Sequence, residues 1–91
     1  EKTFNCVTVD GDTSTSDTVL AFATGRSGAA PLLGWDSSGA DAFYAALVDV
    51  CRQLAQLVVR DGEGASKFIT IRVTGAVSDE SARRIGLAIG N

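Results

Sequence analysis

The chain has 91 residues, a formal net charge of −3, 45% hydrophobic and 21% charged residues, which describes one small globular domain. Its scattered basic residues argue against nucleic acid as a partner, and no apolar run approaches the roughly 20 residues of a membrane helix. Histidine is absent, which excludes a Ser-His-Asp triad, a Cys-His pair and a His-ligated metal site within these residues.

The two cysteines and the two ends of the chain add a further expectation. Cys6 and Cys51 each stand alone in an apolar pattern, which favours buried small hydrophobic side chains over a disulfide and fits a reducing cytoplasm. Methionine is absent even at position 1, and the last periodic segment stops abruptly at Gly90 and Asn91. We therefore expect residues 1–91 to be a single domain that is a fragment of a larger chain.

The first part of the chain predicts a short extended segment, a polar loop and a strand. Residues 4–9 alternate between apolar and polar side chains, and residues 10–17 are small and polar. The polar run resembles a calcium loop only superficially, because Thr15 and Ala21 replace the glycine and the glutamate of an EF-hand. A loop held by local side-chain hydrogen bonds is favoured over a cation site. The apolar run 19–23 has the length of a strand buried on both faces.

A loop over residues 26–37 leads to the first predicted helix. It contains the only proline, Pro31, and the only tryptophan, Trp35. We expect Trp35 to be a packing anchor over the following helix, in preference to a ligand-stacking residue. Residues 38–41 have the character of a capping box, with aspartate in place of glutamate.

A helix over residues 40–59 is the strongest prediction in the chain. One apolar face repeats at spacings of four, three, four and three residues. Its members are Phe43, Leu47, Val50, Leu54 and Leu57.

A strand and a second helix follow. Residues 68–74 alternate so that one face is apolar, Gly75 ends that segment, and Ser78 is placed to cap a helix whose apolar residues face inward. The predicted order is strand, strand, long helix, strand, helix. We therefore predict an α/β (α+β) fold in two layers, with helices covering one face of a mixed sheet.

The stretch between the long helix and the last strand is the candidate binding site. Glu63 lies between Gly62 and Gly64, which both adopt positive φ at little cost, and Lys67 follows four residues later. A carboxylate presented in this way suits a bound cationic group. The alternative is a helix C-cap at Gly62 followed by a solvated turn. A phosphate-binding loop is rejected, because the spacing from glycine to lysine is incomplete and the order is helix to strand.

Two motifs resemble the ornithine acetyltransferase (glutamate N-acetyltransferase) family of arginine biosynthesis. Residues 9–20 read VDGDTSTSDTVL and resemble the family's DGDTSTND-TVL stretch, while residues 60–70 read RDGEGASKFIT and resemble its DGEGATKFIT stretch. Residues 81–85 also fit the family pattern. Ser16 departs from the family's usual asparagine, and the 26–37 loop matches no part of the pattern.

The resemblance implies an activity, a fold and an assembly. The family's precursor cleaves itself, and the new N-terminal threonine carries the acetyl group from N-acetylornithine to glutamate through a covalent intermediate. Some members also accept acetyl-CoA, and no other cofactor is expected. The fold would be N-terminal-nucleophile-like and layered, in a heterotetramer of two α and two β chains in the cytoplasm. The resemblance gives Glu63 the role of a substrate-binding carboxylate near the amino group of the amino-acid substrate.

The same resemblance places the nucleophile outside this chain. In family sequence the threonine lies upstream of Glu1, and further substrate contacts lie downstream of Asn91. Thr3, Thr8 and Thr18 are not N-terminal, so none has the free α-amine that serves as the base. We expect an internal part of the β-chain that has no catalytic residue and no metal, and is inactive alone. The alternatives are a non-catalytic ligand-binding or interaction module of the same fold, and a related aminopeptidase or amidase.

Overall fold

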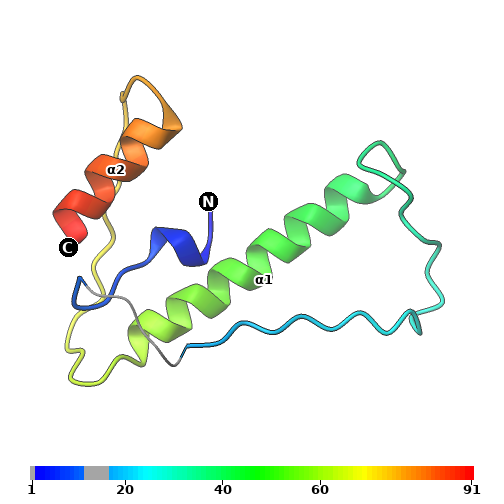
Figure 1. Cartoon of the computed structure of the whole chain (residues 1–91), viewed down its shortest axis with the longest axis horizontal. Helices are drawn as coiled ribbons and strands as arrows, with labels where there is room; N and C mark the ends of the chain where they lie inside the picture. The colour runs from blue at the N-terminus through cyan, green and yellow to red at the C-terminus, as the bar shows by residue number, and fades with distance from the viewer. Residues whose placement is uncertain (1, 12–16) are drawn as a thin grey trace.

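The computed structural model describes residues 2–11 and 17–91, which form one short 3-10 helix and two α-helices (Figure 1). The 3-10 helix η1 spans Phe4–Cys6, α1 spans Ala40–Arg60 and α2 spans Asp79–Gly90. The interior of the predicted polar loop, residues 12–16, lies outside the described residues, and so does the calcium-loop comparison that depends on it.

The long helix is confirmed to within one residue at its C-terminal end, but its predicted N-cap is wrong. The residue before α1 is Gly39, whose φ of 89° is left-handed, and no side chain caps the helix there. Ser37 makes the side-chain hydrogen bonds in the turn before this helix. Its Oγ accepts hydrogen bonds from the backbone N–H groups of Leu33 and Gly34 at 3.0 and 3.1 Å. Ser37 therefore organises the turn before the helix, while the helix itself begins without a side-chain cap.

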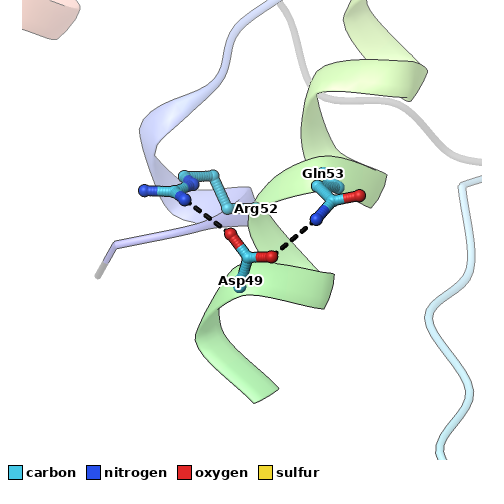
Figure 2. A network of polar contacts seen from close by, with 3 residues as sticks. All are labelled: Asp49, Arg52 and Gln53. Carbon is cyan, nitrogen blue, oxygen red and sulfur yellow. Dashed lines mark hydrogen bonds and ion pairs between the residues drawn. The ribbon is translucent and has the colours of Figure 1, made fainter. Parts of the chain in front are cut away.

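The polar face of α1 carries a small network (Figure 2). The Asp49 carboxylate accepts from the Arg52 guanidinium and from the Gln53 amide, both at 2.6 Å. By length and composition α1 is also the one helix among the described residues that could cross a membrane. An ion pair near its midpoint would be costly at the centre of a bilayer. The pattern indicates an amphipathic helix with an apolar stripe on the other side.

The second helix begins as predicted. Ser78 precedes it in an extended conformation, and its hydroxyl accepts the Ser81 N–H at 3.1 Å. Asp79 and Glu80 lie in the first turn, where the helix dipole favours negative charge. These features are encoded within four residues of one another, so the cap could be read from the sequence.

The N-terminal helix η1 lies against α1, and residues 8–11 lie close to the C-terminal end of α2 (Figure 1). The Arg83 guanidinium donates to the Asn5 carbonyl through Nη2 at 3.0 Å and through Nε at 3.2 Å. The Thr8 hydroxyl donates to Asn91 Oδ1 at 2.7 Å. Two polar contacts thus join segments that are about eighty residues apart in the chain.

The predicted two-layer sheet is wrong for the described residues, which contain two α-helices and no strand. Residues 4–6 form a 3-10 turn, and residues 19–23 and 68–74 carry no regular secondary structure. A strand is defined by backbone hydrogen bonds to a neighbour, whereas alternation of side chains shows only that a segment could bury one face. The segments have the composition of strands, but they do not pair with one another.

The result is an open arrangement with little core. The accessible surface is 8088 Å², against about 5,000 Å² for a compact monomer of 9.4 kDa. The radius of gyration is 16.4 Å, against about 12 Å for a compact domain of this length. Ala40 and Ala55 are the only buried apolar residues in the part of the chain that the structure describes. The predicted apolar stripe of α1 is present, but it is not covered.

The cysteine prediction is confirmed in one respect and corrected in another. No disulfide joins Cys6 and Cys51. Cys51 lies half-buried on α1, as expected of a small hydrophobic side chain, but Cys6 is exposed. The reason is the open arrangement, which leaves the N-terminal segment covered on one side only.

Candidate functional site

The candidate site begins where α1 ends. Asp61 is the residue after the helix, and its N–H donates to the Leu57 carbonyl at 2.9 Å. A tight turn follows, closed by a hydrogen bond of 3.0 Å from the Ala65 N–H to the Gly62 carbonyl. Gly64 occupies the third position of that turn with a φ of 73°, the conformation that a type II turn requires there.

Glu63 lies at the tip of this turn and is exposed. Only Gly64, and not Gly62, has the positive φ that we expected of both glycines, and Gly62 lies beyond the helix end instead of forming its cap. Within residues 2–11 and 17–91, no hydrogen bond or ion pair is recorded for the Glu63 carboxylate. The turn therefore presents an accessible negative charge, a geometry that both a ligand residue and a solvated turn would share.

A shallow pocket lined by cationic side chains adjoins this turn. The turn was predicted from the sequence, but the pocket was not. Its lining residues are Arg60, Ala65, Ser66, Lys67 and Phe68, around a cavity of about 160 Å³. The Arg60 guanidinium lies over the Phe68 ring, 4.7 Å from the centroid. Two cations and no carboxylate line this pocket, so it favours an anion. The signal in the sequence was the pair Arg60 and Lys67, one on each side of the glycine turn.

A second cluster lies at the opposite end of α1. The rings of Trp35 and Tyr44 meet edge to face, with centroids 5.8 Å apart and an interplanar angle of 86°. Together with Asp41 they line a cavity of about 320 Å³. Trp35 contacts α1 as predicted, but its side chain is 79% exposed, so it does not act as a buried anchor.

No group of three or more metal-ligating side chains occurs among the described residues.

Comparison with known proteins defines the class. The chain is 59% identical over 91 residues to the "Arginine biosynthesis bifunctional protein ArgJ" of Ruegeria pomeroyi, covering all of this chain and 21% of the relative. It is 57% identical over 91 residues to the protein of the same name from Zymomonas mobilis, covering all of this chain and 22% of the relative. A relative from Chaetomium globosum, whose name adds "mitochondrial", is 53% identical over 89 residues, covering 98% of this chain and 19% of the relative.

A family model described as the ArgJ family matches residues 1–91. The chain therefore belongs to the ArgJ family, and the resemblance found in the two motifs is confirmed. The chain spans about a fifth of the length of the curated relatives that it matches. No solved structure matches it.

Proposed function

We propose that this chain is part of a glutamate N-acetyltransferase. The complete enzyme would move an acetyl group from N-acetylornithine to glutamate through an acyl-threonine intermediate, with the threonine outside these residues. The support is the match of the whole chain to the ArgJ family and the printed name of its relatives, bifunctional proteins of arginine biosynthesis. The described residues supply part of the substrate site and no nucleophile.

Within that enzyme, Glu63 binds the ammonium group of the amino-acid substrate. The observation that carries this assignment is the exposed carboxylate at the tip of the Gly62–Ala65 turn, for which no cationic partner is recorded among the described residues. A hydrogen bond from an ammonium group to a carboxylate is roughly twice as strong as one between neutral groups. The adjoining pocket of Arg60 and Lys67 supplies the opposite charge for a substrate carboxylate.

The test is Glu63→Gln in the complete enzyme. The amide keeps the shape of the side chain and removes its charge, so the KM for acetylornithine or glutamate should rise about 10- to 150-fold. That range corresponds to about 1.5–3 kcal/mol for one hydrogen bond to a charged group. Self-cleavage, followed by denaturing gel or intact mass, should be unchanged.

Asp61→Asn is the matched control. Asp61 lies two residues before Glu63 and is also exposed, and the substitution likewise replaces a carboxylate by its amide. Its KM should stay within about twofold of the parent enzyme. An unchanged KM in Glu63→Gln, or an equal rise in both variants, would remove Glu63 from the site.

The assembly and location of the enzyme are proposed on similar grounds. We propose partners from the same precursor, an α-chain and a second β-chain, and the uncovered apolar stripe of α1 supports a surface that other polypeptide covers. We propose no resident cofactor, with acetyl-CoA as a second acetyl donor, and neither nucleic acid nor membrane as a partner. The location is proposed as cytoplasmic, although the name of the fungal relative specifies mitochondria for that protein.

No observation favours the alternative of a self-contained module. A module would cover its own apolar surface, whereas Leu47, Val50 and Leu54 of α1 are about half exposed. The prediction of a part of a larger enzyme accounts for this exposure directly.

A further inference from the structure

The Trp35–Tyr44 corner, which we define as the cavity lined by Trp35, Asp41 and Tyr44, is a second candidate site. Its two rings stand at 86° to one another, and the Asp41 carboxylate lines the same cavity. All three residues are exposed in the described structure.

The corner is held in place by the backbone around it. The Ser37 hydroxyl accepts the N–H groups of Leu33 and Gly34, the Ser37 N–H donates to the Gly34 carbonyl at 3.1 Å, and the Ala40 N–H donates to the Ser37 carbonyl at 3.0 Å. These bonds join the turn that carries Trp35 to the first residue of α1. Asp41 and Tyr44 are three residues apart on the helix, so they share one side of it.

The chemistry of the corner selects for a cation with an apolar body. Each ring offers a face of negative electrostatic potential, and the carboxylate adds a full negative charge. An anion would be repelled, and a metal ion would find a single carboxylate. Among the described residues, Asp41 takes part in no ion pair, and the Arg60 guanidinium lies over Phe68 at the other end of α1.

We propose that the Trp35–Tyr44 corner binds an alkylammonium group. The group comes either from a small free amine or from a lysine side chain. The rings pack against its methylene groups and its charge, and Asp41 accepts a hydrogen bond from its nitrogen.

This site is separate from the one proposed around Glu63. Asp41 and Tyr44 lie in the first turns of α1, whereas Glu63 follows its last residue, Arg60, and the helix from Tyr44 to Arg60 is about 24 Å long. No small amine could reach both. The inference therefore stands whether or not Glu63 binds substrate.

The experiment is a titration of the complete protein labelled with 5-fluorotryptophan, observed by fluorine NMR. The Trp35 resonance is identified as the one missing in Trp35→Phe. Addition of n-butylammonium chloride should shift this resonance in a saturable manner, whereas n-butanol and sodium chloride should not. An equal shift with n-butanol, or no saturable shift with n-butylammonium, would overturn the proposal.

Two variants separate binding from folding. Asp41→Asn should weaken the affinity for n-butylammonium at least about fivefold, and Asp41→Glu, which keeps the charge, should restore most of it. Unchanged affinity in Asp41→Asn would overturn the proposal. Titration with Nα-acetyl-lysine amide then identifies the source, since tighter binding than n-butylammonium supports a lysine side chain and weaker binding supports a small amine.

Discussion

The two ends of α1 carry different kinds of site. At the C-terminal end, Glu63 lies in a motif of the family, while the local geometry shows only an exposed carboxylate on a tight turn. At the N-terminal end, none of Trp35, Asp41 and Tyr44 lies in either of the two motifs that carry the resemblance, but their geometry indicates a ligand class. Sequence resemblance and geometry therefore point to different residues, and each finds what the other does not.

The two sites stay apart if α1 is held rigid in the complete enzyme by polypeptide that covers its apolar stripe, and Leu54→Ala tests whether the stripe is covered. Leu54 lies in the apolar stripe and is 47% exposed in the described structure. If other polypeptide covers the stripe in the complete enzyme, the substitution removes buried contacts and should lower the free energy of unfolding by about 2–5 kcal/mol. Thermal or denaturant unfolding of the complete enzyme measures the loss.

Gln56→Ala is the control for that substitution, because Gln56 lies off the stripe. It should change stability by less than about 0.5 kcal/mol. If Leu54→Ala changes the free energy of unfolding as little as Gln56→Ala does, the apolar stripe is not covered in the complete enzyme. Contacts along the stripe would then not hold α1 rigid between the two sites.

At the C-terminal end, Gly64→Ala should weaken the site around Glu63. An alanine in the left-handed conformation at φ 73° costs roughly 1–2 kcal/mol, so the turn would rearrange and move the carboxylate. We expect the KM of the complete enzyme for its amino-acid substrate to rise about 5- to 30-fold. Steady-state kinetics with acetylornithine and glutamate measure this change.

Gly64→Asn sharpens this prediction, since asparagine adopts the left-handed conformation more readily than alanine. Its KM should lie between those of the parent enzyme and Gly64→Ala. Equal effects of the two variants would mean that the added side chain, and not the turn conformation, is responsible.

What the sequence could predict depended on the range of the interactions. The helix at Ala40–Arg60 and the Ser78 cap are set by residues within a few positions of one another, and both were predicted. The strands at 19–23 and 68–74 were wrong, because pairing depends on a neighbour that no local pattern specifies.

The candidate sites follow the same division. Glu63 was found from its glycines and from a family motif, both local in the sequence. The Trp35–Tyr44 corner was missed, because a loop residue and a helical residue nine positions apart meet only through the turn that Ser37 holds. The contact of Arg60 with Phe68 was missed for the same reason, since the glycine turn brings them together.

At the N-terminal end, Ser37→Ala should make the position of Trp35 less fixed without changing any residue that lines the Trp35–Tyr44 corner. The substitution removes the hydroxyl that accepts hydrogen bonds from two backbone N–H groups. Those N–H groups lie in an exposed turn, so water can replace the hydroxyl as their acceptor. At about 0.5–1.5 kcal/mol for a hydrogen bond, the affinity for n-butylammonium should fall about two- to tenfold. The fluorine NMR titration of the complete protein measures this change.

Ser38→Ala is the matched control for the N-terminal end, because the structure records no hydrogen bond of the Ser38 side chain with the described residues. It should leave the affinity for n-butylammonium unchanged. The KM for acetylornithine should be unchanged in both serine variants, since the corner and Glu63 lie at opposite ends of α1. A parallel rise in KM for Ser37→Ala would mean that the two ends act as one site, and the division between them would fail.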